Sequence, residues 1–295
     1  MSLSSSHRLP SGVRPGGRFD DWHPRPIRYV VCDVDGTLVG PTPHASDEVV
    51  AAIARAANDG LRVGYATGRM RDAVADLHRQ LGTPGPHLLH NGAEVRHDGQ
   101  TIAIWPLTAD DIDTLLDIAT EHDEIYLEIY GESGFYVSSW DERARPHWEV
   151  LGAEPLGIIR HSDDVEGLVV PKATFTAFTE GALDWLFDRL PAVGLELGHA
   201  GSPLTPGLSF INLSRPGTTK GAALRRAAEH LKIPLDHVAA VGDAANDLPM
   251  LQVAGTAMAM GQAPEEIRAA AHLIVPEVDQ HGVATALDAL RSFNI

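Results

Sequence analysis

The chain has 295 residues, of which 44% are hydrophobic, so it is long enough to bury one large core or two ordinary ones. Its 23 basic and 40 acidic residues give a formal net charge of −17, which repels polyanions, and we therefore expect no nucleic-acid partner. The single cysteine, Cys32, excludes a disulfide within the chain.

The N-terminal segment is rich in Ser, Gly, Pro and Arg, a composition typical of disorder. We therefore expect residues 1–27 to form a disordered N-terminal tail. The segment lacks the apolar stretch of a signal peptide, and no apolar run in the chain is long enough to span a membrane. Together with the single cysteine, these features favour a cytoplasmic protein with no membrane partner.

From Arg28 onward, apolar runs alternate with amphipathic helical patterns. A strand at 28–32 precedes a helix that Ser46 caps and Gly60 ends. A second strand, in the sequence LRVGYA, leads to another helix and then to a short strand in the sequence HLL. Repeated β-α-β units of this kind predict a parallel sheet with helices on both faces.

The middle of the chain has a different pattern. One hairpin is expected around Asp98-Gly99 and a second one between residues 131 and 134, and three more strands lie in KATFTAFT, GLELGHA and LSFINLS. Helices near 108–122 and 180–190 separate these strands. Hairpins with interspersed helices indicate an α+β unit inserted into the α/β chain.

After Ser214 the alternation of strands and helices resumes and continues to the last helix, near 281–291. The predicted fold is therefore an α/β parallel-sheet core with an inserted α+β unit. We expect residues 28–94 and 214–295 to form the core and residues 95–213 to form the insertion.

Polar residues follow the ends of several predicted strands. Because ligands bind at the carboxyl ends of the strands in parallel α/β sheets, we expect these polar groups to converge on one crevice. The groups are Asp33 with Asp35, Thr67-Gly68-Arg69, Asn91-Gly92, and Asp243 with Asn246 and Asp247, and Lys220 opens a helix nearby. Alone, Asn91-Gly92 is more typical of a tight turn than of a catalytic element.

The carboxylates of Asp33 and Asp35 would repel each other unless one is protonated or a cation lies between them. Asp243 and Asp247 add further carboxylates. Hard oxygen ligands in this number suit Mg²⁺, which binds through one or two carboxylates and a substrate phosphate. Lys220 is one of only three lysines, with Lys172 and Lys232, and an ammonium at a helix start suits a phosphoryl group.

The chemistry that uses these parts is phosphoryl transfer to a carboxylate. Asp33 would attack phosphorus and form an aspartyl-phosphate. Asp35 would give a proton to the leaving oxygen and later take one from the hydrolytic water. Mg²⁺ and Lys220 would spread the negative charge of the transition state.

The segments DVDGT, ATGR, TTKG and GDAANDLPML, in this order, resemble the four sequential motifs of the haloacid dehalogenase superfamily of phosphatases. HNGAEV and the long insertion resemble its Cof-type branch, subfamily IIB, which carries a C2B cap. The resemblance implies a Rossmann-like core with an inserted α+β cap domain and an Mg²⁺-dependent phosphatase.

The resemblance also implies residue roles. Asp33 is expected to be nucleophile and metal ligand, and Asp35 to be acid/base with its backbone carbonyl on the metal. Thr67, Gly68, Lys220 and Asn246 are expected to bind the substrate phosphate, and Asp243 to ligate Mg²⁺ with Asp247 supporting it from behind.

Four points stay open. The expected substrate is a small phosphorylated metabolite, a sugar phosphate or a cofactor phosphate, and the protein is expected to be a monomer or homodimer. A phosphomutase and a non-catalytic phospho-ligand sensor are the alternative functions. One group of residues in the insertion could either contact the substrate or serve packing and surface charge: Trp140, Arg143, Arg145, His147 and Trp148.

Overall fold

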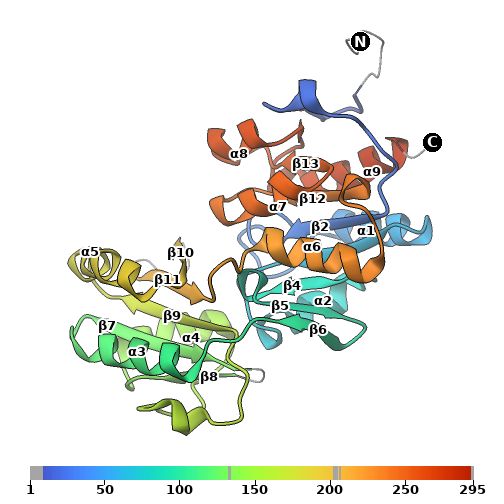
Figure 1. Cartoon of the computed structure of the whole chain (residues 1–295). Coiled ribbons are helices and arrows are strands. Elements are labelled where there is room, and N and C mark those ends of the chain that lie inside the picture. The colour runs from blue at the N-terminus through green and yellow to red at the C-terminus, as the bar shows by residue number, and fades with distance from the viewer. Residues whose placement is uncertain (1–8, 132–133, 202–204, 206, 294–295) are drawn as a thin grey trace.

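The described residues form two β-sheets, a larger one in the core and a smaller one in the insertion (Figure 1). The computed structural model describes residues 9–131, 134–201, 205 and 207–293. Residues 107–214 contain the smaller sheet, and we call them the insert. We call the remaining described residues the core.

The core sheet has the strand order β1-β14-β13-β12-β2-β3-β4-β5-β6. Strands β14, β13, β12, β2, β3 and β4 are parallel, which confirms the α/β parallel sheet expected from the sequence. The strands are β1 (Arg14–Pro15), β2 (Tyr29–Asp33), β3 (Arg62–Ala66), β4 (His87–Leu89), β5 (Glu94–His97), β6 (Gln100–Ile104), β12 (Val238–Gly242), β13 (Thr256–Ala259) and β14 (Leu273–Ile274).

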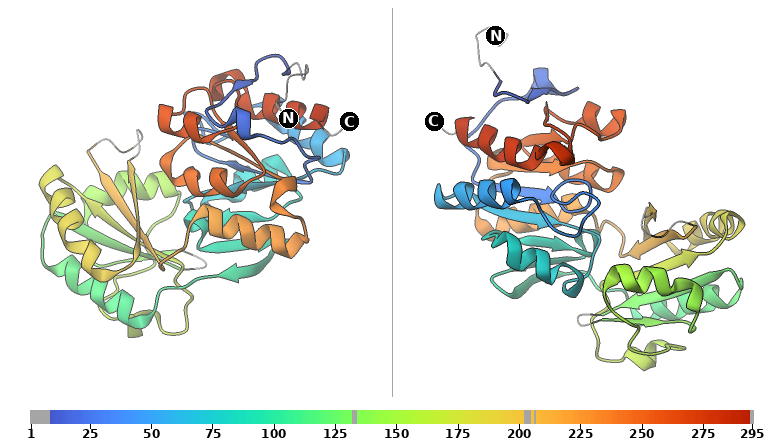
Figure 2. Two further views of the ribbon diagram at one scale, coloured as in Figure 1. Left: turned by 45° about the horizontal axis from the view of Figure 1, so that its top comes forward. Right: turned by 180° about the vertical axis from the view of Figure 1, so that it is seen from behind.

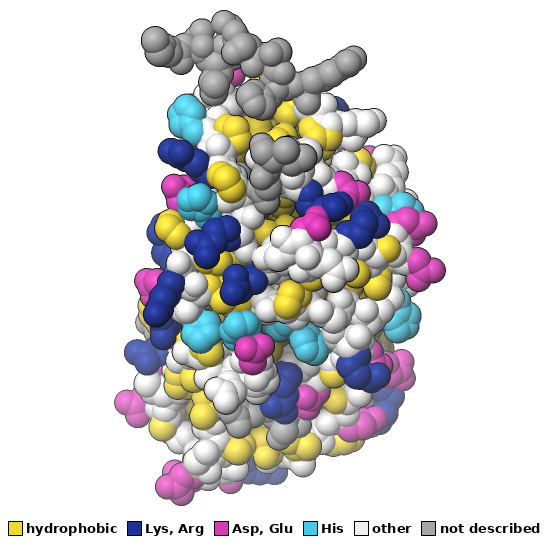
Figure 3. Space-filling model, turned by 90° about the vertical axis from the view of Figure 1, so that its right-hand side faces the viewer, with side chains coloured by type: hydrophobic (Ala, Val, Ile, Leu, Met, Phe, Trp, Pro, Cys, Tyr) yellow, Lys and Arg dark blue, Asp and Glu magenta, His cyan; other side chains and the backbone are white. Residues whose placement is uncertain are grey.

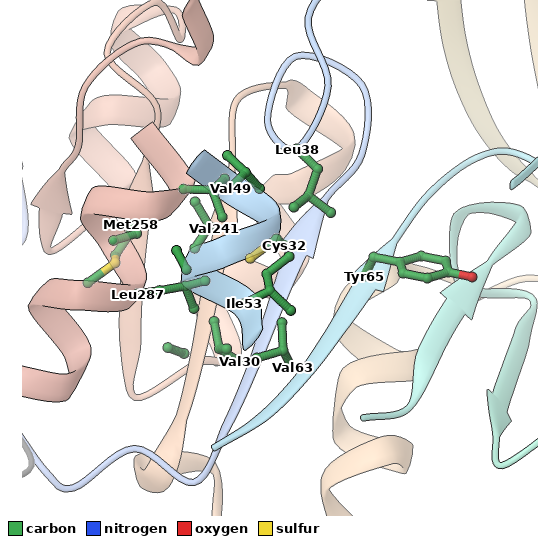
Figure 4. Packing of buried hydrophobic residues seen from close by; sticks show 14 of the residues in the cluster. Val30, Cys32, Leu38, Val49, Ile53, Val63, Tyr65, Val241, Met258 and Leu287 are labelled. Carbon is green, nitrogen blue, oxygen red and sulfur yellow. The ribbon is translucent and has the colours of Figure 1, made fainter. Parts of the chain in front are cut away.

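Helices cover both faces of the core sheet, because successive residues of its buried central strands point to opposite faces. Val30 and Cys32 pack with α1 and α9 in one apolar layer (Figure 4), whereas Tyr29 and Val31 pack with α6 and α7 in the other. Figure 2 shows α1 and α9 together on one side. The helices are α1 (Asp47–Asn58), α2 (Ala75–Leu81), α6 (Lys220–Leu231), α7 (Leu248–Val253), α8 (Glu265–Ala270) and α9 (Gly282–Phe293).

The hairpin of β5 and β6 turns at Asp98-Gly99, as expected, with φ of 50° and 76° at these two residues. It does not belong to the insert, because β5 pairs antiparallel with β4 and so extends the core sheet. The insertion therefore starts after this hairpin and not at residue 95 as expected. The sequence pattern predicted the hairpin, but it could not show which sheet the hairpin joins.

The insert carries an antiparallel sheet with the order β10-β11-β9-β7-β8. Helices α3 and α5 pack on one face of this sheet, and Trp148 of α4 packs on the other. Helix α4 was not expected, and residues 132–133 of the expected second turn lie outside the described residues. The elements are α3 (Ala109–Thr120), β7 (Ile125–Tyr130), β8 (Phe135–Val137), α4 (Arg145–Leu151), β9 (Lys172–Ala177), α5 (Glu180–Arg189), β10 (Glu196–Gly201) and β11 (Ser209–Ser214).

The N-terminal segment differs from the disordered tail expected from its composition, at least over residues 9–27. β1 pairs antiparallel with β14, which would otherwise be the edge of the core sheet. Val13, Trp22 and Ile27 are buried in the core. The prediction from composition was wrong here because these few apolar residues are outnumbered by Ser, Gly and Pro. Residues 1–8 lie outside the described part of the chain.

The surface carries charges of both signs. Acidic, basic and histidine side chains are intermingled on the face shown in Figure 3. In the insert, Arg143 pairs with Asp141 and Glu124, and Arg145 pairs with Glu142. Among the residues that the structure describes, no helix is both long and apolar enough to cross a membrane.

Trp22 provides a test of the packed N-terminal segment. Its side chain is buried, its indole Nε1 donates to Thr256 Oγ1 at 3.1 Å, and its ring lies edge-on to Phe293. We expect Trp22→Ala to lower the free energy of unfolding in urea by roughly 3–5 kcal/mol, because it leaves a cavity in the core.

The control is Trp140→Ala, since Trp140 is 48% exposed and its loss is expected to change this free energy little. Equal stability of the two variants would mean that the N-terminal segment does not contribute to the core.

Candidate active site

Asp33 and Asp243 lie at the carboxyl ends of two adjacent parallel strands. Asp33 ends β2, and Asp243 directly follows β12, which pairs with β2 over Val241 and Cys32. After Asp33 the chain turns tightly at Gly36, whose φ is +85°. A Cβ at this position would lie 2.3 Å from Asp243 Oδ2, so only glycine lets the turn approach the carboxylate this closely.

Lys220 lies at the centre of the group. It is the first residue of α6, which Thr219 caps by accepting from Ala222 N, and its side chain is only 1% exposed. Its Nζ donates to Asp33 Oδ1 at 2.5 Å and to Asp247 Oδ1 at 2.6 Å. One ammonium thus joins acids that are 187 and 27 residues away in the sequence.

The carboxylates form a candidate metal site. Oxygen atoms of Asp33, Asp243 and Asp247 lie within 4.8 Å of one another. Asp247 is held in place because its Oδ2 accepts from Asp243 N and Ala244 N at 2.9 and 3.0 Å, and Thr37 Oγ1 donates to Asp243 Oδ1 at 2.9 Å. A set of hard carboxylate oxygens fits Mg²⁺.

The buried charges shift one another's protonation. Burial raises the pKa of Asp33 well above its usual range and the negative charge of Asp247 raises it further, although Lys220 opposes both. Burial also raises the pKa of Asp243, to about 6. Burial by itself would lower the pKa of Lys220, but the carboxylates of Asp247 and Asp33 outweigh it and raise that pKa. The protein alone therefore has an excess of negative charge here, which a bound cation would neutralise.

The Thr67–Arg69 loop follows β3, the next strand of the sheet. Thr67 is buried, and its Oγ1 accepts from Arg69 N at 3.1 Å, which leaves the hydroxyl proton free to be donated. Gly68 lies against Asn91, since a Cβ on Gly68 would be 3.0 Å from Asn91 Oδ1. The same oxygen accepts from Asn246 Nδ2 at 3.2 Å.

Asn91 is therefore more than the tight-turn residue that its sequence indicates. It lies in the short 3₁₀ segment η3 (His90–Gly92), where φ is positive at all three residues. Such a conformation is costly for residues other than glycine and persists where the surroundings impose it. Gly92 is required because a Cβ there would lie 2.3 Å from Thr219 O, at the start of α6.

Asp35 is placed differently from the other predicted acids. Its side chain is 56% exposed, and it forms a two-point ion pair with Arg69, in which Arg69 Nε lies 3.1 Å from Asp35 Oδ2. Its carboxylate is not part of the three-acid group described above. Arg69 is therefore the ion-pair partner of this exposed carboxylate.

Comparison with known proteins agrees with this fold. A family described as haloacid dehalogenase-like hydrolase matches residues 30–287, and the chain belongs to this family. The resemblance drawn from the four motifs is thereby confirmed. The protein is therefore an enzyme, a hydrolase of this family.

Individual relatives carry phosphatase names. Phosphatase YwpJ of Bacillus subtilis is 29% identical over 283 residues, covering 88% of this chain and 98% of that protein. Pyridoxal phosphate phosphatase YbhA of Escherichia coli is 23% identical over 281 residues, covering 87% and 96%. Among solved structures, BT1666 of Bacteroides thetaiotaomicron has a TM-score of 0.76 at 24% identity over 97% of this chain and 99% of its own, which shows the shared fold.

The Lys220 ion group is also a stability element that can be tested. In the presence of a metal chelator, we expect Lys220→Met to lower the free energy of unfolding by about 3–5 kcal/mol, because two buried carboxylates lose their counter-ion. Urea denaturation measures this change.

Lys232→Met provides the matched control, since the same substitution there affects an exposed lysine and is expected to change the free energy by less than about 0.5 kcal/mol. If K220M proves as stable as K232M, the buried ion group does not contribute to folding.

Proposed function

We propose that the enzyme hydrolyses small phosphomonoesters through an aspartyl-phosphate on Asp33, with Mg²⁺ as cofactor. The observation that carries this proposal is the buried group in which Lys220 joins Asp33 and Asp247, with Asp243 oxygen within 4.8 Å. A nucleophilic carboxylate, a fixed cation and further hard oxygen ligands are the parts that phosphoryl transfer requires.

Asp33 and Asp243 would hold Mg²⁺, with the Asp35 backbone carbonyl as a further ligand and Asp247 fixing the group from behind. When bound, the ion neutralises charge on the phosphoryl oxygens and keeps the Asp33 carboxylate ionised. Thr67, Gly68, Lys220 and Asn246 are the proposed contacts to the phosphoryl group. The Thr67 hydroxyl has a proton to donate, as described above.

In the first step, an Asp33 oxygen forms a bond to phosphorus while the bond from phosphorus to the leaving oxygen breaks. Asp35 gives its proton to that leaving oxygen, and the alcohol departs. In the second step, water attacks phosphorus, Asp35 takes a proton from it, and the bond to Asp33 breaks to release phosphate. Asp33 and Asp35 return to their starting states.

This sequence requires that Asp35 leave its ion pair with Arg69. The Asp35 side chain is exposed and lies only two residues beyond Asp33, so a rotation of the side chain would turn it toward a substrate bound at Asp33. Arg69 would then be free to face the negative charge of the substrate.

The insert would act as a cap and contact the leaving group. Met70 of the core packs in one apolar cluster with Tyr126, Tyr130 and Trp148 of the insert, so the two units are in contact beside the Thr67–Arg69 loop. Sugar phosphates and cofactor phosphates are the proposed substrates. The name of YbhA, a pyridoxal phosphate phosphatase, supports the second class.

Asp33→Asn tests the nucleophile. We expect this variant to fold normally and to lose at least about a thousandfold of its turnover of a generic aryl phosphate, because a neutral amide cannot attack phosphorus. Release of inorganic phosphate without an activating bisphosphate measures the activity and distinguishes a phosphatase from a mutase.

The matched control is Asp98→Asn, at a turn residue whose side chain is 86% exposed, and it is expected to leave turnover unchanged. Activity retained in D33N would place the nucleophile elsewhere.

Removal of Mg²⁺ tests the cofactor. Chelation is expected to stop turnover and added Mg²⁺ to restore it, and Asp243→Asn is expected to raise the half-saturating Mg²⁺ concentration by about tenfold or more, because it removes a charged ligand. Titration of activity with Mg²⁺ measures both effects. Turnover that ignores the chelator would remove the metal from the mechanism.

A further inference from the structure

One lysine of the insert reaches into the core. Lys172, the first residue of β9, donates from its Nζ to the backbone oxygen of Gly68 at 3.1 Å. The contact joins residues 104 positions apart and runs from the insert sheet to the Thr67–Arg69 loop of the core. Lys172 is buried, which is unusual for lysine and calls for a specific environment.

The insert holds this ammonium with a buried polar cluster. Tyr130 pairs with Lys172 across the sheet, and Nζ lies 4.1 Å from the centre of its ring. The Tyr130 hydroxyl is 2.5 Å from Glu128 Oε2, and the same oxygen is 3.2 Å from His147 Nε2 of α4. Within the described part of the chain, the buried Glu128 Oε1 has no hydrogen-bond partner, and Glu128 favours the charged form of Lys172 electrostatically.

The hydrogen bond of Lys172 fixes one particular peptide group. The Gly68 carbonyl and the Arg69 N–H belong to the same peptide unit, and this N–H donates to Thr67 Oγ1 at 3.1 Å. Lys172 therefore holds one end of the unit while Thr67 holds the other. Glycine at 68 has little resistance to rotation of this unit, so the two hydrogen bonds determine its orientation.

We propose that Lys172 is a positioning residue of the phosphatase: it fixes the Gly68–Arg69 peptide and, through it, the Thr67 hydroxyl, and so makes the shape of the phosphate-binding loop depend on contact with the insert. This inference rests on the proposed role of Thr67 and Gly68 in binding the phosphoryl group. It assigns a function in the reaction to a lysine that lies outside the four motifs.

The charge state of Lys172 sets the conditions for a test. Burial lowers its pKa to about 8, with Glu128 opposing the shift. Tyr130 lies against the ammonium, and His147 lies beside Tyr130 and Glu128 in the same cluster. From η3, His90 also faces Lys172, and burial and Lys172 lower the pKa of His90 well below its usual range. At pH 7 the ammonium is therefore mostly charged while His90 is neutral, and assays belong at this pH.

Lys172→Met tests the proposal. Because misplacing a substrate-binding group can cost up to about a hundredfold in rate, we expect K172M to lower kcat for an aryl phosphate at pH 7 by about tenfold or more. KM is expected to change by less than about twofold, since Lys172 does not touch the substrate. Exchange of the Arg69 amide, followed by NMR, is expected to become at least about tenfold faster, while amides of α1 stay unchanged.

Lys232→Met is the matched control and is expected to keep wild-type kcat, KM and amide exchange. Lys172→Arg keeps a charged donor in place and is expected to recover part of the kcat and of the amide protection. In every variant that folds, K172R included, kcat and protection of the Arg69 amide must fall or recover together. A change in one without the other would overturn the proposal, and so would a K172M variant that behaves like K232M.

These outcomes are separate from those of the proposed function. If D33N is inactive and K172M has wild-type kcat, only the role of Lys172 is wrong. If wild type and D33N hydrolyse the aryl phosphate equally, the nucleophile is wrong, and the amide exchange still reports whether Lys172 fixes the loop.

Discussion

The structure depends on one buried ammonium between two buried carboxylates. Lys220 donates to Asp33 and Asp247, and none of the three side chains is more than 7% exposed. Charges removed from water in this way are tolerated only when their partners lie within hydrogen-bond distance. β2, α6 and the 3₁₀ segment η8 (Ala245–Asp247) must therefore meet at one point at the carboxyl edge of the core sheet.

Glycines and positive φ angles in the surrounding backbone allow these segments to approach one another closely. Gly36 admits the Asp243 carboxylate and Gly92 admits the start of α6, and at both positions a Cβ would overlap neighbouring atoms. His90 and Asn91 adopt positive φ, a cost that places the Asn91 amide between Gly68 and Asn246. Strained backbone and glycine residues thus surround these side chains. Such departures from the local rules of stability are typical of functional sites.

The insert is tied to the same edge of the sheet by apolar and polar contacts of different kinds. Met70 packs against its aromatic residues, whereas Lys172 hydrogen-bonds to the Gly68 backbone. An apolar contact tolerates small displacements, but a charged hydrogen bond to one carbonyl is directional. Movement of the insert would therefore first change the conformation of the loop that follows β3, close to where the substrate phosphate is proposed to bind.

The sequence alone was enough for the α/β class, because periodicities of strands and helices are local, and for the family, because its four motifs keep their order along the chain. It also placed Asp33, Lys220, Asp243 and Asp247 in one group, since parallel strands bring their carboxyl ends together. Only the tertiary structure decided which sheet the Asp98-Gly99 hairpin extends, that Trp22 anchors the N-terminal segment, that Asp35 pairs with Arg69, and that Lys172 reaches Gly68. These features arise from contacts between residues far apart in the chain, and such contacts leave no periodic or compositional trace in the sequence.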